Sequence, residues 1–156
     1  MDSPPLKRSV HGTCIALGPV CAILRGPPGA GKSDLALRFL FLPAERFAAP
    51  PVLVADDQVL LRRAGERIIA SCPAALSGRI EVRGIGIVDQ PASPEAELKL
   101  LVDLDGAGDM PRFPVAKVWE TILDRPILRV ALDPFEASAP IKLALALQNF
   151  LGVPVD

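Results

Sequence analysis

The stretch that decides the fold is a short loop rich in glycine and proline. It consists of Gly26, Pro27, Pro28, Gly29, Ala30, Gly31, Lys32 and Ser33. This order fits the phosphate-binding loop pattern G-x-x-x-x-G-K-[ST]. The glycines let successive backbone N–H groups face one anion, and a helix that starts after the loop adds its positive dipole end. We therefore predict an ATP site, with Lys32 at the β- and γ-phosphates and the Ser33 hydroxyl at Mg²⁺.

The segments on either side of this loop supply the context that such a loop requires. Residues 20–25 form an apolar run that predicts a strand, and residues 13–17 predict a second strand joined to it through Gly18-Pro19. Residues 32–42 carry apolar side chains at helical spacing. A strand, a glycine-rich loop and a helix in this order favour a true phosphate site over a chance turn.

The rest of the chain alternates between strands and helices, which predicts an α/β fold. We expect strands at 52–55, 59–63, 67–70, 80–88, 98–104 and 127–132, and helices at 115–123 and 139–151. The wholly apolar run 52–55 suits a central strand buried on both faces. Gly84 and Gly86 predict a bulge or a close backbone approach within 80–88. Several strand pairs are hairpins, so we predict a P-loop-containing mixed β-sheet flanked by helices. Residues 1–9 are expected to be a flexible leader, and residues 10–152 a single P-loop kinase domain.

Composition excludes several classes of function. The chain has 156 residues, half of them apolar, and a net charge of −1. Such a chain can bury one core and presents no basic field for nucleic acid. No apolar stretch approaches the roughly 18 residues of a membrane span. The three cysteines fit no metal-ligand spacing. We expect a cytoplasmic protein without nucleic-acid or membrane partners.

Two adjacent carboxylates, Asp56 and Asp57, follow the predicted strand 52–55. Ligands of open α/β sheets lie beyond the carboxyl ends of the strands. A carboxylate there can bind Mg²⁺ or take a proton from a hydroxyl nucleophile, and adjacent side chains point to opposite sides. We expect the two aspartates to divide these roles, the alternative being a solvated turn.

Two charged residues in the β-rich stretch 78–87 extend the candidate site. Glu81 and Arg83 alternate with apolar residues, which places both charges on one face. They suit a second metal ligand and a phosphate clamp. Spacing alone favours a surface ion pair. His11 is the only histidine, and taken alone it suggests a structural or solvated side chain.

Four segments in order carry a resemblance to a known family. They are Val10-His-Gly, the phosphate loop followed by Asp34-Leu-Ala-Leu, Leu53-Val-Ala-Asp-Asp, and Ile80-Glu-Val-Arg-Gly-Ile-Gly-Ile. Over about residues 10–150 the chain resembles the C-terminal catalytic domain of HPr kinase/phosphorylase, in a short form that lacks the N-terminal domain. The last segment matches the signature of that family and is far more specific than the phosphate loop.

The resemblance implies roles for individual residues. Asp57 matches the general base toward the seryl hydroxyl of the HPr protein, and His11 a histidine beside that base. Lys32 and Ser33 keep their phosphate-loop roles. Glu81 matches a second Mg²⁺ ligand, beside the Asp56 and Ser33 proposed above. Arg112 matches a later catalytic arginine. The resemblance further implies a core related to phosphoenolpyruvate carboxykinases, ATP and Mg²⁺ as cofactors, an HPr-like phosphocarrier as partner, and a homo-oligomer, commonly a hexamer.

The sequence departs from the family pattern at two places. Asp34 stands where the family more often has Glu. Leu132-Asp-Pro-Phe-Glu stands near the place of a Pro-Gly-Arg-Asn segment that the resemblance links to dephosphorylation. Whether the reverse, phosphorylase reaction is kept is therefore left open. Two other functions also stay open: a P-loop kinase of a small metabolite, and a nucleotide-sensing regulatory partner of a phosphocarrier or signalling kinase that does no chemistry.

Overall fold

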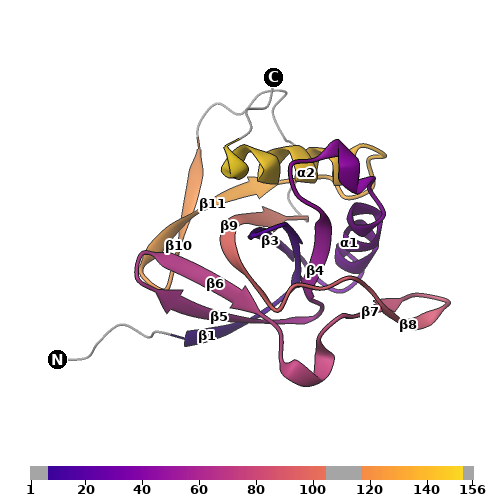
Figure 1. The fold of residues 1–156 in the computed structure, drawn as a ribbon, viewed down its shortest axis with the longest axis horizontal. Coiled ribbons are helices and arrows are strands. Elements are labelled where there is room, and N and C mark those ends of the chain that lie inside the picture. The colour runs from indigo at the N-terminus through magenta and orange to yellow at the C-terminus, as the bar shows by residue number, and fades with distance from the viewer. Residues whose placement is uncertain (1–6, 105–116, 153–156) are drawn as a thin grey trace.

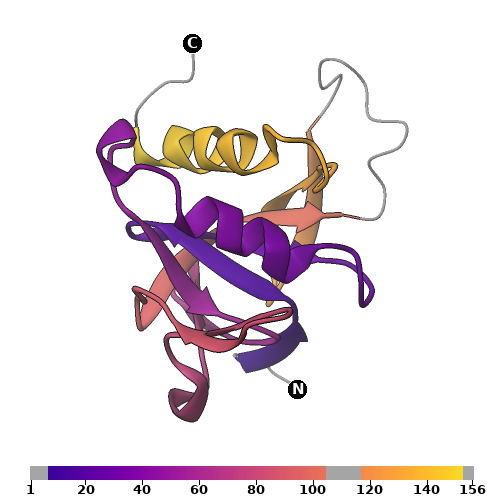
Figure 2. The same cartoon turned by 90° about the vertical axis from the view of Figure 1, so that its right-hand side faces the viewer.

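The computed structural model describes residues 7–104 and 117–152, in which two α-helices pack on one face of a curved β-sheet (Figures 1 and 2). The strands are β1 (Lys7–His11), β2 (Thr13–Leu17), β3 (Val20–Arg25), β4 (Pro51–Ala55), β5 (Gln58–Ala64), β6 (Arg67–Ser71), β7 (Arg79–Val82), β8 (Gly86–Asp89), β9 (Glu95–Asp103), β10 (Val118–Ile122) and β11 (Arg125–Ala131). The helices are α1 (Lys32–Leu40) and α2 (Ala139–Gln148), with short 3₁₀ turns η1 (Ala44–Arg46), η2 (Ala74–Leu76) and η4 (Asn149–Leu151).

The large sheet is mixed, as predicted, and it branches at β9. Its main order is β1-β5-β6-β9-β3-β2-β4. Along one edge, the first residues of β9 pair antiparallel with β6 and its last residues pair parallel with β11. Strand β3 pairs parallel with β9, while β10 and β11 form a hairpin. Strands β7 and β8 form a separate two-stranded sheet.

The carboxyl ends of four strands lie at one edge of the sheet. Strands β3, β9 and β11 are mutually parallel through their pairing, and β4 runs with β3 because both are antiparallel to β2. The phosphate loop follows β3, the Asp56-Asp57 pair follows β4, and residues 132–136 follow β11. This is the edge at which open α/β sheets bind their ligands.

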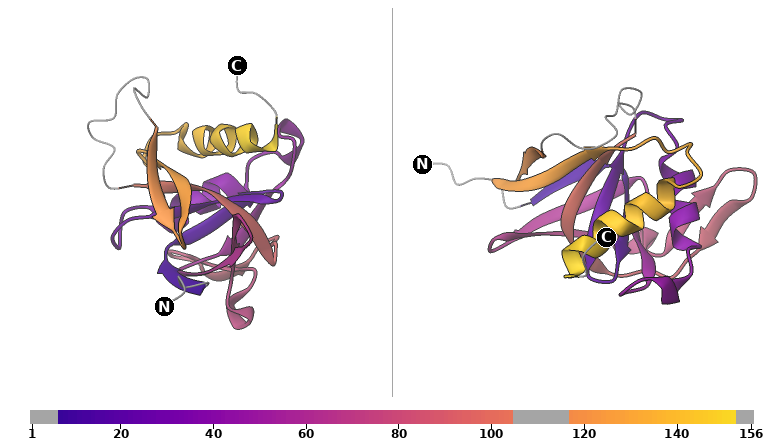
Figure 3. Two further views of the ribbon diagram at one scale, coloured as in Figure 1. Left: turned by 90° about the vertical axis from the view of Figure 1, so that its left-hand side faces the viewer. Right: turned by 90° about the horizontal axis from the view of Figure 1, so that it is seen from above.

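Two apolar clusters hold the fold together. The first lies between the helices and the sheet, where Leu35 and Phe39 of α1 meet Leu143 and Leu147 of α2. The second is built by strand residues and includes Cys14 and Cys21. Figure 3 shows the curvature of the sheet from two further directions. Burial raises the pKa of the Cys21 thiol well above its usual range, which keeps it protonated. Both cysteines are free and buried.

The helix predicted at 115–123 is wrong. Residues Val118–Ile122 form strand β10, paired with β11 through a turn at Leu123-Asp124. Both turn residues have positive φ, 47° and 69°, the backbone that tight hairpins require. Because such turns usually contain Gly or Asn, the pair Leu123-Asp124 does not indicate a hairpin. The pairing of β10 with β11 determines the structure of this segment.

The stretch 80–88 is a hairpin rather than one interrupted strand. A Cβ at Gly84 or Gly86 would meet nothing within 4 Å, so no close approach explains these glycines. Their φ angles of 85° and 121° do, because residues with side chains rarely adopt such a backbone. The glycines serve the turn.

Three smaller differences concern strand ends and strand position. Strand β4 is buried as predicted, yet it ends the main order instead of lying centrally. Its outer edge is covered by hydrogen bonds of Leu53 with Pro91 and Ser93. Strand β1 begins at Lys7, inside the predicted leader, and β9 begins three residues before position 98. The strands at 13–17 and 20–25 have the predicted bounds.

No helix in the described part of the chain is long and apolar enough to cross a membrane.

Candidate functional site

The phosphate loop has the strained backbone that only glycine adopts at low cost. It follows β3, and Gly31 is the N-cap of α1. Gly29 and Gly31 have φ of 84° and 98°. The Lys32 ammonium reaches back across the loop and donates hydrogen bonds to the carbonyls of Gly26 (2.6 Å) and Pro27 (3.0 Å). The cation therefore lies inside the loop.

The residue before the loop is fixed by a cluster of charges. The Arg25 guanidinium donates to Asp103 at 2.9 Å and to both carboxylate oxygens of Glu120, at 2.7 and 2.9 Å. Arg129 lies 3.6 and 3.7 Å from the same carboxylates. Arg25 holds the pKa of Glu120 below its usual range, chiefly through the hydrogen bond. Strands β3, β9, β10 and β11 are thus joined beside the loop.

Asp56 links three elements around the start of α1. Its Oδ1 accepts hydrogen bonds from the hydroxyls of Thr13 (3.0 Å) and Ser33 (3.1 Å), and its Oδ2 accepts from the backbone N–H of Glu81 (3.2 Å). Thr13 is a polar residue buried to 1% exposure among apolar strand residues. Thr13 was not among the site residues predicted from sequence, although a hydroxyl at the start of an otherwise apolar strand was an available signal.

Asp57 points elsewhere, toward His11. Its backbone has φ of 75°, a left-handed conformation that Asp tolerates better than most residues. The carbonyl of Asp57 accepts a hydrogen bond from Gly12 N–H at 3.0 Å, and its Oδ1 lies 3.4 Å from His11 Nδ1. Both side chains are well exposed, Asp57 at 78% and His11 at 65%. The two adjacent aspartates therefore have separate surroundings, as their positions predicted.

These segments line one cleft of about 620 Å³. The phosphate loop and α1 contribute Gly29, Gly31, Lys32, Ser33 and Leu37, and the remaining lining includes His11, Asp57, Glu81, Arg83 and Phe135. Phe135 was not among the predicted site residues. Its place depends on the fold of the segment after β11, which the sequence pattern did not reveal.

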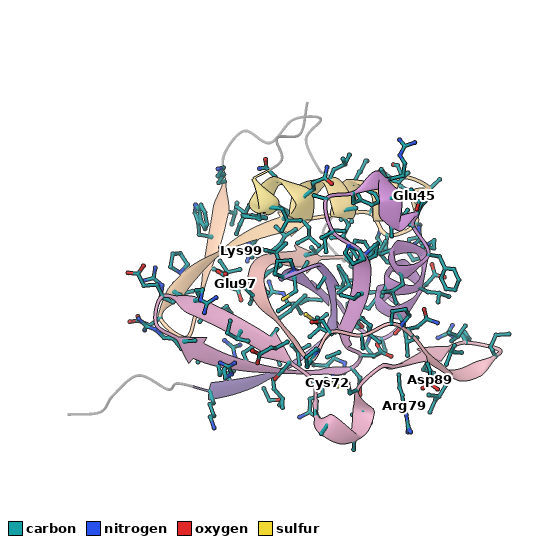
Figure 4. All side chains as sticks on the ribbon, in the orientation of Figure 1. Glu45, Cys72, Arg79, Asp89, Glu97 and Lys99 are labelled. Atoms are coloured by element: carbon teal, nitrogen blue, oxygen red, sulfur yellow. The ribbon has the colours of Figure 1, made fainter. Side chains whose placement is uncertain are left out.

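Glu81 and Arg83 both face this cleft, as predicted from their alternation. None of the ion pairs within residues 7–104 and 117–152 joins the two, so the alternative of a mutual surface ion pair does not hold there. Arg79, the third charge of this stretch, stands opposite Asp89 in the β7–β8 register (Figure 4). On the central sheet, Lys99 and Glu97 form an ion pair of 2.8 Å (Figure 4).

The oxygen atoms around Ser33 suit a magnesium ion that also binds phosphate. Mg²⁺ prefers oxygen ligands and commonly uses one or two carboxylates together with substrate phosphates and water. The Ser33 hydroxyl and the Asp56 carboxylate are 3.1 Å apart beside the phosphate loop, and Glu81 lies on the same cleft. Within the described residues no group of three or more His, Cys, Asp or Glu side chains could hold a metal on its own. These residues fit a metal shared with a nucleotide.

The structure thus brings together every predicted site residue that it describes. Arg112, the predicted catalytic arginine, and the predicted loop 106–114 lie outside the described residues.

Comparison with known proteins gives consistent relatives. Among curated proteins, the HPr kinase/phosphorylase of Aromatoleum aromaticum is 32% identical over 151 residues, covering 89% of this chain and 46% of that protein. That of Alkaliphilus metalliredigens is also 32% identical, covering 87% of this chain and 43% of that protein. The chain therefore spans about half the length of the curated relatives it matches.

A solved structure and a family model indicate the same family as these relatives do. The structure of the HPr(Ser) kinase/phosphatase from Coxiella burnetii matches with a TM-score of 0.75 at 24% identity, covering 92% of this chain and 96% of that one. This likeness shows the same fold. The model of the HPr Serine kinase C-terminal domain matches residues 5–114, more than half of the chain. The chain belongs to the HPr serine kinase C-terminal domain family.

Proposed function

We propose that this chain is a Mg²⁺- and ATP-dependent kinase that phosphorylates a serine on an HPr-like phosphocarrier protein. The observation that carries the proposal is a single cleft in which the phosphate loop faces an exposed aspartate paired with a histidine. A pure nucleotide sensor would need the loop but not the base. Family membership supports the same activity.

Phosphoryl transfer requires mainly that the reacting groups are positioned and that charge is neutralised, because the phosphoryl group passes between oxygens. Lys32 would contact the β- and γ-phosphates, and Arg112 would neutralise charge on the transferred group. Ser33, Asp56 and Glu81 would hold Mg²⁺, which would supply positive charge to offset that of the phosphates. Asp57 would take the proton of the incoming seryl hydroxyl as that oxygen attacks the γ-phosphorus. The bond between the γ-phosphorus and the β,γ-bridging oxygen would break, and ADP would leave. His11, 3.4 Å from Asp57, would orient the base.

The exposure of Asp57 favours a protein acceptor over a small metabolite. At 78% exposure its carboxylate is open to a hydroxyl carried on the surface of another protein. Kinases of small substrates generally enclose the acceptor to exclude water. From the family resemblance we also propose that the chain works as a cytoplasmic homo-oligomer, a hexamer, which light scattering after size-exclusion chromatography would test.

Incubation with labelled ATP, Mg²⁺ and an HPr-like protein tests the activity. The proposal expects label on one serine of the acceptor, located by mass spectrometry, and no label when Mg²⁺ is chelated. ATP binding without transfer to any HPr-like protein would identify a sensor instead. Transfer to small alcohols in the absence of protein would identify a metabolite kinase. Either result would overturn the proposal.

A further inference from the structure

One exposed aromatic ring lies at the cleft, and the mechanism above leaves it unused. Phe135 follows β11 and its ring is 75% exposed. Two other large aromatic side chains are strongly exposed in the described part of the chain, Phe41 at 72% and Trp119 at 56%. Neither lines the cleft, whereas Phe135 does. An exposed aromatic ring at a cleft can contact a bound ligand if the position of the ring is fixed.

The backbone around Phe135 is fixed from both sides. Its own N–H donates to Asp133 Oδ1 at 2.9 Å. The guanidinium of Arg38, on α1, donates to the carbonyls of Pro134 and Glu136, the latter at 3.3 Å. Arg38 is in turn held by Asp34 at 3.0 Å. The segment 133–136 is therefore held against α1, and the backbone that carries the exposed ring is fixed beside the cleft.

The ring also lies beside the phosphate loop. A Cβ added at Gly31 would lie 3.6 Å from Phe135 Cε1, which is ordinary van der Waals contact. Gly31 is the N-cap of α1, so the ring stands beside the helix end that attracts phosphate. Leu37 and Val82 line the same cleft. These apolar groups border the space that the ribose and base of a nucleotide can enter when its phosphates occupy the loop.

We propose that Phe135 is the platform on which the nucleobase of the bound nucleotide stacks. This inference rests on the proposed function, because it requires a nucleoside triphosphate in the loop. Stacking on an aromatic face accepts every base, since every base has a π-face. ATP and GTP should therefore bind with similar affinities. The position of Phe135 would fix the base, while the loop fixes the phosphates.

Binding measurements on Phe135→Ala test the proposal. Dissociation constants are measured by calorimetry with Mg²⁺ for ATP, GTP and inorganic triphosphate, which lacks a base. We expect the variant to bind both nucleotides about tenfold more weakly and to bind triphosphate as the wild type does. The matched control is Phe41→Ala, which removes an equally exposed ring away from the cleft and should change none of the three constants.

The outcomes separate this inference from the proposed function. Unchanged ATP binding by Phe135→Ala would overturn the stacking and leave the kinase proposal standing. Equal weakening of ATP and triphosphate would also overturn it, because the ring would then only shape the loop. If the wild-type protein bound neither ATP nor triphosphate, both the stacking and the kinase proposal would be overturned.

A fluorescent variant provides a direct signature. Phe135→Trp in a Trp119→Phe background places one indole at the proposed contact. ATP and GTP should quench its emission and triphosphate should not, because only a stacked base meets the indole. Quenching by all three ligands, or by none, would overturn the inference.

Discussion

The Ser33 hydroxyl donates a hydrogen bond of 3.1 Å to Oδ1 of Asp56, and this contact joins the first turn of α1 to the residue after β4. The oxygens of both side chains are of the type that Mg²⁺ selects. A metal bound there would contact the start of α1, next to the phosphate loop, and the Asp56 carboxylate together.

The substitution Ser33→Ala should separate metal binding from phosphate binding. It removes one oxygen beside the loop, so we expect the gain in ATP affinity on adding Mg²⁺ to fall by about tenfold. ATP affinity in the presence of a chelator should stay near the wild-type value. Titration with and without Mg²⁺ measures both, and Ser33→Thr should restore the gain because it keeps the hydroxyl. An unaltered Mg²⁺ dependence in Ser33→Ala would remove Ser33 from the metal site.

The substitution Asp57→Asn should remove phosphoryl transfer and keep nucleotide binding. Loss of a general base typically lowers the rate by about 10²–10⁴. Asn is the suitable replacement, because it tolerates the φ of 75° at this position at least as well as Asp. Transfer to the HPr-like protein and ATP affinity are measured in parallel.

The control for this variant is Asp124→Asn. Asp124 is also an exposed aspartate with positive φ, at 69°, in the turn between β10 and β11. It should leave the transfer rate unchanged. Wild-type turnover by Asp57→Asn would show that another group accepts the proton.

The substitution Gly31→Ala should disturb both the loop and its neighbour. The φ of 98° disfavours a side chain, and the new Cβ would lie 3.3 Å from Pro134 Cβ. We expect a loss of about 1–2 kcal/mol in the free energy of unfolding and weaker ATP binding. Gly65→Ala is the control, since Gly65 has φ of 66° with open space around its Cβ position. If both variants lose equal stability and bind ATP equally well, contact with Pro134 has no consequence.

The substitution Glu120→Gln should reduce stability in a pH-dependent manner. The folded pKa of Glu120 lies below its ordinary value of 4.5, so the ionised carboxylate stabilises the fold above that pH. The stabilisation is lost as the pH falls through the lowered pKa. We expect Glu120→Gln to cost about 1–2 kcal/mol at pH 7, with a smaller difference from wild type near pH 3.

Urea unfolding at the two pH values measures this difference. Glu66→Gln, at the exposed turn between β5 and β6, is the control and should show little change at either pH. A constant difference between Glu120→Gln and wild type at both pH values would contradict the role of the charge.

The parts of the site that could be predicted from sequence are those formed by residues that are close together in the chain. The phosphate loop requires glycines at fixed spacing, and Asp56-Asp57 directly follow a buried strand. These short motifs therefore predicted both the phosphate loop and the aspartate pair. The roles of Thr13 and Phe135 depend on pairings between distant segments, and their neighbours in sequence do not specify those pairings. The β10 hairpin was missed for a local reason, because its turn at Leu123-Asp124 lacks the usual Gly or Asn.

The ion pair between Arg25 and Glu120 spans 95 residues of sequence and has a practical consequence. The family match ends at residue 114, yet Glu120, Phe135 and the apolar face of α2 all come after it. A fragment cut at residue 114 would leave Leu35 and Phe39 uncovered and would release Arg25 from its partner on β10. Such a fragment should aggregate on expression. The shortest soluble nucleotide-binding fragment should extend at least through Leu151.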